Sequence, residues 1–385
     1  MTTRLVALGE VCSFVGGGTP SRKAPAYFKG EIPWATVKDF KSFTINDTEE
    51  HITEQALEDS ASNLVQPGAV LLVTRVGLGK VAIAGTRLAI NQDVKAVLPN
   101  SDEIQPEYLF WFLLSQAKRI QAMGTGATVK GVTLNDMRAI RIPLPPLPEQ
   151  RRPVDLLSRA EGIVRLRREA QAKTAELIPA LFLEMFGDPA SNPKGWPVVE
   201  LGEYLAIPSS VKMPDLEVER DIPCIGADSI ESGTGKIVSW PTVGDIRPIS
   251  GKYHFEKDDV LYSKIRPALR KAILAPSDGY CSADMYPLRP TQDRATPEFV
   301  VALLLSKDFT DYAIGVSMRA QMPKVNRETL FAYKAPLPPI DLQRQFACKV
   351  EAVRAIAAQQ SDALATAQAT FEALLHQLFA SSHPG

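Results

Sequence analysis

The chain has 385 residues, of which 45% are hydrophobic and 23% are charged, a composition typical of a globular protein with about two or three domains. Its 43 Lys and Arg residues against 44 Asp and Glu residues give a formal net charge of −1, which excludes a globally basic nucleic-acid binder but not a local basic face. We see no apolar signal core and no run of about 18 apolar residues, so we expect a cytoplasmic protein that does not enter a membrane. The four cysteines form no CxxC pair, and we expect four buried thiols rather than disulfides or a zinc site.

The first part of the chain shows mixed α and β patterns. Residues 16–23 are rich in glycine and hydroxyl side chains, and their backbone N–H groups are candidates for contacting a phosphate, with a flexible surface turn as the equal alternative. Residues 70–73 and 81–84 are strand-like apolar runs separated by two glycines. Residues 108–120 are expected to be helical. Together these patterns predict a mixed α/β module of about 145 residues.

The second part of the chain repeats the first. Leu-Gly-Glu at residues 8–10 recurs at residues 201–203, and Pro-Leu-Pro-Pro at residues 143–146 recurs at residues 336–339. Both pairs are 193 residues apart, and between them the offset falls to 190 or 191. This period is much longer than the 20–50 residues typical of a solenoid repeat. We therefore predict two copies of one module, each a globular part followed by a long helix.

Each copy ends in a stretch whose apolar residues alternate by three and four positions. In residues 346–378 this heptad seam continues for nearly five heptads, which is typical of coiled-coil packing. The corresponding seam of residues 153–185 is apolar at its ends and polar in its middle. The predicted seam contacts are Leu157, Val164, Ile178, Leu181, Phe346, Val350, Val353, Leu364, Phe371 and Leu374.

A helix of this length with an apolar seam needs a partner. The nearest candidate is the helix of the other copy, and a pseudo-twofold duplication would place the two helices antiparallel. The alternative is that each helix folds back on its own globular part. The proline-rich segments at residues 143–148 and 336–339 indicate a stiff exit from each module and favour the first arrangement. The predicted fold is α+β, with two mixed α/β domains joined by two long helices in an antiparallel coiled coil.

Residue patterns for catalysis or cofactor binding are not evident. The glycines of residues 16–19 are not followed by Gly-Lys-Ser/Thr, and residues 77–80 lack the third glycine of a dinucleotide-binding site. The four histidines are isolated from one another and from the cysteines, so a metal site is not expected. We therefore expect no catalytic, cofactor or metal site in this chain.

Four segments of three kinds are candidates for contacting nucleic acid. Residues 261–274 contain four cations and no acidic residue; a solvated strand and loop is the equal alternative. Residues 124–130 and 317–324 combine small residues with hydroxyl or amide groups beside a cation, although polar surface turns have the same composition. The third kind is the glycine-rich segment of residues 16–23. Lys and Arg position a protein on phosphates, whereas Arg, Asn, Gln and Thr contact base edges.

Several motifs resemble the specificity subunits of type I restriction-modification systems. Gly-Gly-Thr-Pro-Ser at residues 17–21, Ile-Pro-Trp at residues 32–34 and Lys38-Asp39 look like the opening of a target-recognition domain of that family. The segments at residues 261–267 and 143–150 look like two further family motifs, the latter being the entry into the family's helical spacer. The resemblance covers nearly the whole chain, in order and in duplicate.

The resemblance implies a non-catalytic DNA reader whose two target-recognition domains each read half of a split site. It also implies that two methyltransferase subunits and restriction subunits bind this chain, with S-adenosylmethionine and ATP on those partners. The implied boundaries are residues 1–147 and 188–339 for the two domains and residues 148–187 and 340–380 for the two spacer helices. A coiled-coil scaffold without DNA specificity is the alternative function.

The predicted DNA-contacting residues come from both modules. They are Gly17, Gly18, Thr19, Ser21, Lys38, Arg75, Lys80, Thr128 and Lys130 in the first module, and Lys264, Arg266, Arg270, Lys271, Arg319, Gln321 and Lys324 in the second. Because the two interiors differ in sequence, we predict that they read different half-sites.

Overall fold

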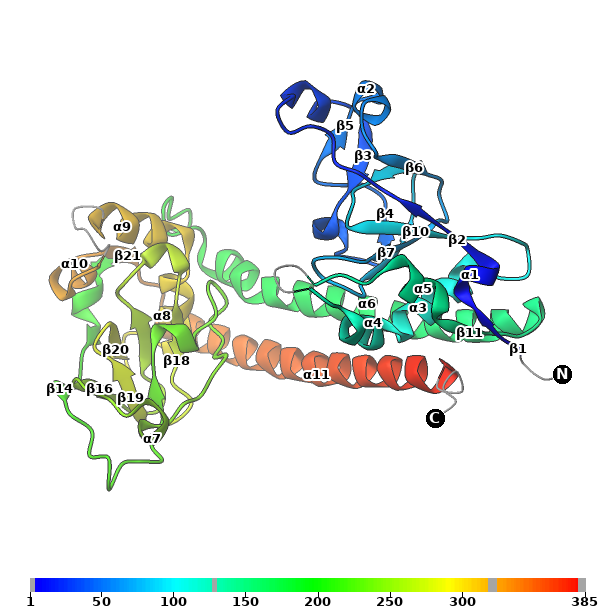
Figure 1. Ribbon diagram of the computed structural model, residues 1–385. Helices are drawn as coiled ribbons and strands as arrows, with labels where there is room; N and C mark the ends of the chain where they lie inside the picture. Colours follow the sequence, from blue (N-terminus) through cyan, green and yellow to red (C-terminus); the bar gives the residue numbers. More distant parts are fainter. Residues whose placement is uncertain (1–3, 127–129, 318–323, 380–385) are drawn as a thin grey trace. The chain divides into compact units, whose positions relative to one another are not determined.

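The computed structural model describes residues 4–126, 130–317 and 324–379 (Figure 1). It divides into two compact units, Met1–Leu166 with Leu364–Gly385 and Arg167–Ala363. Each unit therefore contains one globular part, half of the helix α6 (Leu147–Phe186) and half of the helix α11 (Ile340–Phe379). These two helices cover the heptad stretches of residues 153–185 and 346–378.

Unit 1 contains three sheets. A five-stranded sheet has the order β2-β10-β7-β8-β4, a four-stranded sheet has the order β5-β3-β9-β6, and β1 pairs with β11. The strands are β1 (Arg4–Ala7), β2 (Cys12–Gly16), β3 (Ile32–Ala35), β4 (Thr44–Ile45), β5 (His51–Ile52), β6 (Asn63–Val65), β7 (Val70–Val73), β8 (Val81–Ala84), β9 (Leu88–Ile90), β10 (Val94–Pro99) and β11 (Arg141–Leu144). The predicted strands at residues 70–73 and 81–84 are the neighbours β7 and β8.

Apart from α6 and α11, the described helices of unit 1 are short. They are α1 (Leu8–Val11), η1 (Pro25–Phe28), η2 (Val37–Asp39), α2 (Glu54–Glu58), α3 (Pro106–Ser115), α4 (Ala117–Met123) and α5 (Leu134–Ala139). Six consecutive residues of α3, Tyr108 to Leu113, are buried, and they pack in one apolar cluster with Val70 and Leu72 of β7. The predicted helix at residues 108–120 is thus α3 followed by α4.

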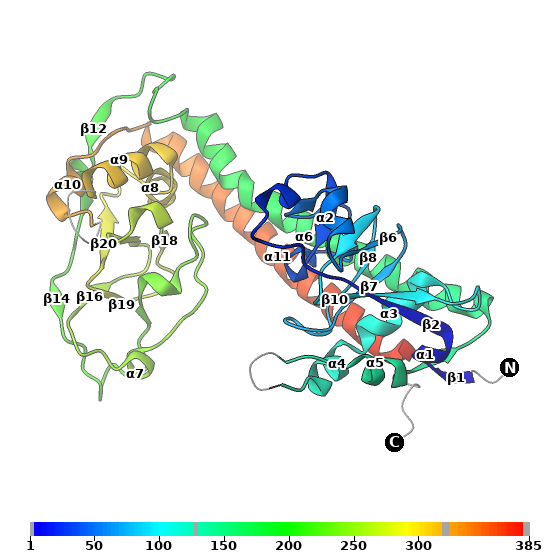
Figure 2. The same cartoon turned by 45° about the horizontal axis from the view of Figure 1, so that its top comes forward.

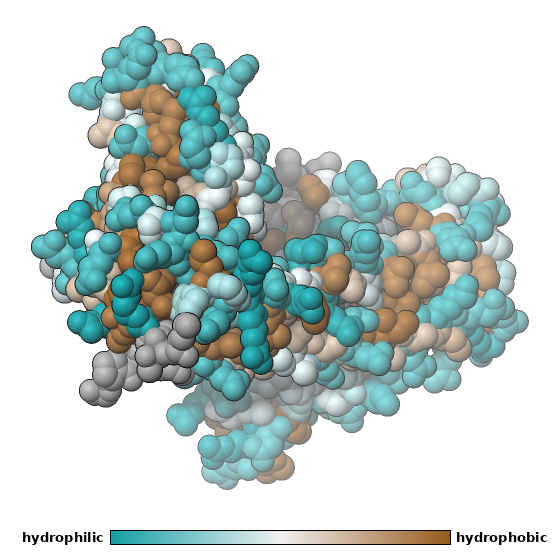
Figure 3. Space-filling model, turned by 90° about the vertical axis from the view of Figure 1, so that its right-hand side faces the viewer, coloured by the Kyte–Doolittle hydropathy of each residue, from teal (hydrophilic) through white to brown (hydrophobic). Residues whose placement is uncertain are grey.

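A smaller lobe of unit 1 surrounds Trp34. The apolar cluster of this lobe contains Trp34, Ile52, Ala56 and Ala89, and the Trp34 indole N–H donates to Gly18 O at 3.2 Å. Figure 3 shows this lobe at the top, hydrophilic at its tip near α2 and with apolar side chains below the tip. Because the apolar residues lie inward, the lobe has a core of its own.

Unit 2 repeats the sheets of unit 1. Its strands are β12 (Val198–Glu200), β13 (Leu205–Ala206), β14 (Val211–Lys212), β15 (Cys224–Ile225), β16 (Lys252–Phe255), β17 (Val260–Ser263), β18 (Ala272–Leu274), β19 (Gly279–Ser282), β20 (Met285–Pro290) and β21 (Lys334–Pro336). The sheet β13-β20-β17-β18 has the order of β2-β10-β7-β8, and β12 pairs with β21 as β1 does with β11. The parallel pair β15 and β19 corresponds to β3 and β9. The predicted duplication is confirmed.

The remaining helices of unit 2 are short, apart from the helix pair itself. They are η3 (Leu201–Glu203), η4 (Ala227–Ser229), α7 (Val243–Ile246), η5 (Pro267–Leu269), α8 (Pro297–Leu304), α9 (Lys307–Ser317) and α10 (Arg327–Phe331). Phe299 of α8 and Tyr262 of β17 belong to the main apolar cluster of this unit, which also includes Phe346 of α11. Helix α8 therefore takes the place that α3 has in unit 1.

Helices α6 and α11 run antiparallel where they pair within a unit. In unit 2, Arg167 of α6 donates to Gln360 of α11 at 3.2 Å, whereas the Phe186 ring lies 5.1 Å from the Phe346 ring. Residue numbers thus rise along one helix and fall along the other (Figure 2). In unit 1 the start of α6 shares an apolar cluster with the end of α11. This confirms the predicted helix pairing. Gly187, with a φ of +84°, ends α6.

One prediction about the thiols is wrong. Cys12, Cys224 and Cys281 are buried, as expected, and all four cysteines are free. Cys348, however, is exposed on α11. The reason is its position two residues after Phe346, which places it on the outer face of a helix whose seam residues face inward.

Candidate nucleic-acid interface

The turn between β7 and β8 lies next to the chain that follows the predicted segment of residues 124–130. Arg75 and Gly131 form an isolated bridge, and Val132 N donates to Thr74 O at 3.0 Å. Residues in the turn have positive φ angles, including Val76 at +37° and two glycines. A left-handed Val is strained, and such strain gathers at functional sites. Arg75 and Lys80 of this turn are far in the sequence from residues 124–130, and the fold brings them close to the described part of that segment.

Exposed cations surround this turn. The Arg75 side chain is half exposed, with its Nε 3.7 Å from Asp93 Oδ1. Lys80 and Lys130 are also exposed. Lys38 is exposed on η2. Its neighbour Val37 lies against the turn, because Val37 Cγ2 is only 2.9 Å from the position that a Cβ atom on Gly77 would take. Four predicted DNA-contacting cations of unit 1 therefore lie around one turn.

Two further cations, which were not among the predicted residues, lie at this place. Lys118 and Arg119 are exposed near the start of α4. The preceding residue, Ala117, has its carbonyl oxygen 2.6 Å from where a Cβ on Gly79 would be. Helix α4 therefore starts against the turn. No local pattern reveals this proximity, because the turn and the helix are separated by more than thirty residues.

In unit 2 the turn between β17 and β18 lies next to the corresponding loop, at residues 324–325. Ile265 and Lys324 form an isolated bridge, and Val325 N donates to Lys264 O at 2.8 Å. Arg266 and Arg270 have positive φ angles of 49° and 50°. The same arrangement of turn and loop thus occurs in both units, while its side chains differ.

The four cations of the second turn have different surroundings. The Lys264 side chain is buried, with Nζ 4.7 Å from the centroid of the Tyr286 ring, and burial lowers the pKa of Lys264. Arg270 Nε donates to Leu305 O at 3.0 Å, at the end of α8. Lys271 Nζ donates to Ala227 O at 2.6 Å. Arg266, by contrast, is exposed. Three of these four side chains thus contact other residues of unit 2.

In the loop of residues 317–324, Lys324 is the predicted DNA-contacting residue that the structure describes. Its side chain is exposed. Its charge also lowers the pKa of Lys264. Thr128, Arg319 and Gln321 lie outside the described residues.

The glycine-rich segment of unit 1 has a structural role. Gly18 N donates to Ile90 O at 3.1 Å, so this N–H is not free to meet a phosphate as predicted. A Cβ on Gly17 would lie 2.1 Å from Ile90 O, and one on Gly18 would lie 2.5 Å from Ala61 C. Both positions require glycine because two other segments approach closely. The Thr19 hydroxyl donates to the Gln92 amide oxygen, and both Thr19 and Ser21 are exposed.

The predicted seam residues all lie on inward-facing positions of the two helices. The fully buried ones are Leu157, Val164, Phe346, Val350 and Val353, and the half-buried ones are Ile178, Leu181, Leu364, Phe371 and Leu374. Sequence analysis missed Phe182, which is buried one position from the seam and stacks on Phe299 of α8 at 5.8 Å.

Metal-ligand geometry does not occur in the part of the chain that the structure describes. Across residues 4–126, 130–317 and 324–379, no three or more His, Cys, Asp or Glu side chains gather closely enough to hold an ion. In the same ranges, no helix has the length and hydropathy to cross a membrane.

Comparison with known proteins points to one family. The family model described as the type I restriction modification DNA specificity domain matches residues 3–174 and again residues 193–364. The chain is 30% identical over 314 residues to the EcoDI specificity subunit of Escherichia coli, covering 72% of this chain and 70% of that one. It is 31% identical over 238 residues to the MjaIX specificity subunit of Methanocaldococcus jannaschii, covering 55% of this chain and 52% of that one.

Two solved structures share the fold. The S subunit of the M. genitalium type I restriction-modification system matches with a TM-score of 0.56 and 16% identity, covering 98% of this chain and 96% of that chain. A chain from a study of complex assembly and conformational transition of the type I R-M system matches with a TM-score of 0.61 and 22% identity, covering 98% and 97%. Both similarities concern the fold.

Proposed function

Because the chain belongs to the family of type I restriction-modification DNA specificity proteins, matched by the family model in both halves, we propose that each unit reads one half of a split DNA site. The surface proposed for reading is the turn after β7 or β17 together with the loop that bridges to it. The observation that carries this proposal is the recurrence of the two bridges, Arg75 to Gly131 and Ile265 to Lys324, on one backbone plan with different side chains.

The cations around each turn are suited to the phosphate backbone. In unit 1 these are Lys38, Arg75, Lys80 and Lys130, and in unit 2 they are Arg266 and Lys324. Phosphate contacts supply affinity and orientation without sequence information, whereas side chains aimed at base edges supply specificity. Because the side chains of the two turns differ, the two units are expected to read different half-sites, which makes the whole target asymmetric and bipartite.

The reaction itself is proposed to belong to partner proteins. We propose that two methyltransferase subunits bind along the helices and that restriction subunits join them, with S-adenosylmethionine and ATP bound by those partners and the complex working in the cytoplasm. The similarity to a chain from the study of type I R-M complex assembly supports a role within a larger complex. The near-zero net charge agrees with weak DNA binding by the isolated chain.

A coiled-coil scaffold without DNA specificity explains the helices alone. It does not explain why both globular modules match the DNA specificity model. DNA recognition is therefore the favoured function.

A module exchange tests this proposal. Residues 190–335 are replaced by the equivalent module of a relative, and the modified sites are mapped by methylome sequencing of a host that carries the operon. We expect one half-site to change while the other half and the gap between them stay the same. A matched exchange of residues 1–140 is expected to change the opposite half. Replacement that alters both halves, or neither, contradicts the proposal.

A further inference from the structure

Unit 2 contains a cavity that the proposed DNA function does not use. Its volume is about 400 Å³, and it is lined by residues of α6, α8 and α11. Ile178 and Phe182 of α6, Val301 of α8 and Val353 of α11 form part of its mostly apolar lining. A cavity of this size with an apolar lining has the properties of a small-molecule site, and such sites often lie between packed helices.

In unit 1 the corresponding place is filled by aromatic side chains. The Phe43 ring lies 5.4 Å from the Phe110 ring and 5.7 Å from the Trp111 ring. The Trp111 ring in turn lies 5.7 Å from the Phe371 ring. These four rings come from the loop before β4, from α3 and from α11. They form a continuous aromatic cluster between the sheet and the helices.

The repeat places smaller residues at these four positions in unit 2. At the offsets that align the two copies, the counterparts of the rings are Gly233, Val301, Ala302 and Ile178. All four line the cavity. The cavity is therefore the space that the aromatic rings of unit 1 occupy, left open because unit 2 lacks those rings.

A cation also lines this cavity. Arg354 of α11 is half-buried, and among the described residues its guanidinium has neither a hydrogen bond nor an ion pair. Burial lowers the pKa of Arg354, and the charge of Glu298 on α8 opposes this shift without forming an ion pair. Another lining cation, Arg270, already donates to Leu305 O. An arginine removed from water and lacking a partner favours an anion, and it binds a carboxylate through two parallel hydrogen bonds.

We propose that this cavity binds a small aromatic carboxylate. The ring takes the space that Phe43 and Trp111 fill in unit 1, and the carboxylate accepts hydrogen bonds from Arg354. The lining of this cavity does not include Arg266 or Lys324, the two cations of unit 2 proposed to contact DNA.

Titration calorimetry on the full chain tests the proposal with 3-phenylpropionate as the probe. We expect one molecule to bind per chain. The neutral analogue 3-phenylpropanamide has the same ring and length but no charge, so we expect it to bind about ten-fold more weakly, which is typical of losing a charge-assisted hydrogen bond.

Two variants separate the ring from the carboxylate. Ala302→Trp introduces the residue that unit 1 has at this position, so it is expected to abolish binding of the probe without lowering the melting temperature. Arg354→Gln is expected to weaken 3-phenylpropionate about ten-fold and to leave the amide analogue unchanged. Ala369→Trp, at an exposed position of α11 in unit 1, is the control and is expected to leave the affinity unchanged.

Certain results overturn the proposal. Absence of binding by 3-phenylpropionate at millimolar concentration contradicts it, as does equal binding by Ala302→Trp and the unmodified chain. If Ala302→Trp fails to fold, the proposal is tested by comparing the affinities of 3-phenylpropionate and 3-phenylpropanamide for Arg354→Gln. This variant keeps most of the size of the side chain. An equal loss of both probes in Arg354→Gln rejects the pairing of Arg354 with the carboxylate.

Discussion

Gln150 and Gln343, which lie 193 residues apart, make the same set of hydrogen bonds in the two units. Gln150 is fully buried, and its amide oxygen accepts from Gln105 N at 2.9 Å. Its amide nitrogen donates to Glu103 O at 2.6 Å and to Pro145 O at 2.9 Å. One side chain thus joins the start of α6, the turn before α3 and the proline-rich segment between them.

Gln343 does the same at the start of α11. Its amide oxygen accepts from Thr296 N at 3.0 Å, and its amide nitrogen donates to Arg294 O at 3.1 Å and Pro338 O at 2.8 Å. In both units the glutamine satisfies buried backbone groups that have no partner in a helix or sheet. It therefore holds the long helix in a constant orientation on its own recognition module.

Replacing Gln343 is expected to destabilise unit 2. Gln343→Leu keeps most of the volume but leaves one N–H and two carbonyl groups without their partner, at a cost of about 2–4 kcal/mol in the free energy of unfolding. Urea unfolding followed by circular dichroism measures the loss. Gln345→Leu, at an exposed position two residues further along α11, is the control and is expected to change stability by less than about 0.5 kcal/mol. Equal effects of the two variants would refute the role of Gln343.

The two cations Lys264 and Arg266 are expected to behave differently in DNA binding. Arg266 is exposed, so Arg266→Ala in the complex with the methyltransferase subunits is expected to weaken binding and to reduce the salt slope by about one. Lys264 is buried against Tyr286, so Lys264→Ala is expected to lower stability with little change in the salt slope. Filter-binding titrations at several salt concentrations measure both.

Lys257 provides the matched control for this comparison. It is exposed and precedes β17, whereas Arg266 follows β17, so the two lie beyond opposite ends of one strand. Lys257→Ala is expected to leave DNA affinity unchanged. A salt slope lowered equally by Lys257→Ala and Arg266→Ala would argue against the turn as the contact surface.

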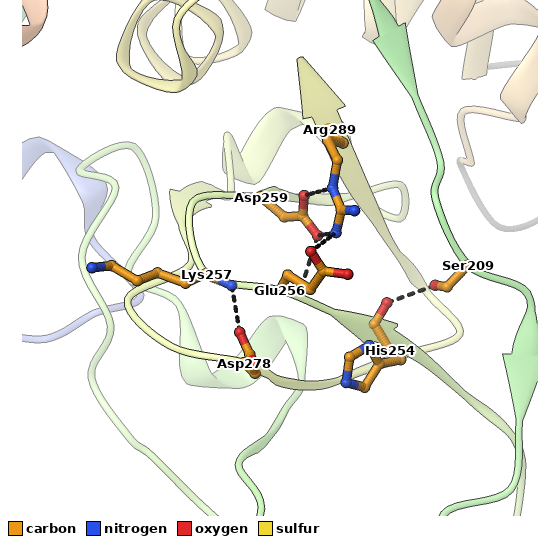
Figure 4. Close-up of polar contacts among 7 residues, drawn as sticks. All are labelled: Ser209, His254, Glu256, Lys257, Asp259, Asp278 and Arg289. Atoms are coloured by element: carbon orange, nitrogen blue, oxygen red, sulfur yellow. Dashed lines mark hydrogen bonds and ion pairs between the residues drawn. The ribbon is translucent and has the colours of Figure 1, made fainter. Parts of the chain in front are cut away.

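An ion pair with the buried carboxylate of Asp259 joins β20 to the residue just before β17. Arg289 of β20 donates to Asp259 through Nε at 2.7 Å and Nη2 at 2.9 Å, and Glu256 N donates to the same carboxylate at 2.9 Å (Figure 4). Asp259 is buried, and this contact holds the pKa of Arg289 above its usual range. The Arg289 side chain is 38% exposed, so water weakens the interaction in part.

Asp259→Asn removes the charge of this pair and keeps its shape. We expect the free energy of unfolding to fall by about 2–3 kcal/mol, the lower part of the range for breaking a buried pair. Glu256→Gln, whose carboxylate is 57% exposed and 3.0 Å from Arg289, is the control and is expected to cost less than about 1 kcal/mol. Thermal unfolding of both variants measures the difference, and a larger loss in Glu256→Gln would contradict this interpretation of the pair.

The thiols are expected to differ in reactivity. Burial raises the pKa of Cys12 to about 12 and also raises the pKa of Cys224 and Cys281, so their nucleophilic thiolates are rare at pH 8. Cys348 is exposed. Iodoacetamide at pH 8 is therefore expected to modify Cys348 alone until the chain unfolds, as read by mass spectrometry. Modification of a second cysteine at a similar rate in the native chain would disagree with the burial.

The same pKa shifts predict a pH dependence of stability. A raised folded-state pKa means that the folded chain keeps its proton more firmly than the unfolded chain does. The contribution of Cys12 is therefore complete below pH 9, and it is lost as the pH rises from 9 toward 12. Stability should fall across this alkaline window, and Cys12→Ala should reduce the slope.

The sequence alone determined the duplicated architecture of this protein. The offset between the copies, the heptad seam and the proline-rich segments are carried by neighbouring residues, so they predicted α6, α11, β7, β8 and β17 correctly. The short motifs at residues 17–21 and 143–150 were likewise sufficient to predict the family, because each consists of neighbouring residues. Periodicity and short motifs depend on local spacing, which a sequence contains directly.

Only the tertiary structure decided what individual side chains do. Four cations of one segment looked alike in sequence, yet Lys264, Arg270 and Lys271 contact the fold and Arg266 faces solvent. The glycines at residues 17–18 looked suited to a phosphate and instead allow close backbone packing. These outcomes depend on partners far away in the chain, such as Leu305 for Arg270, and no local pattern contains that information.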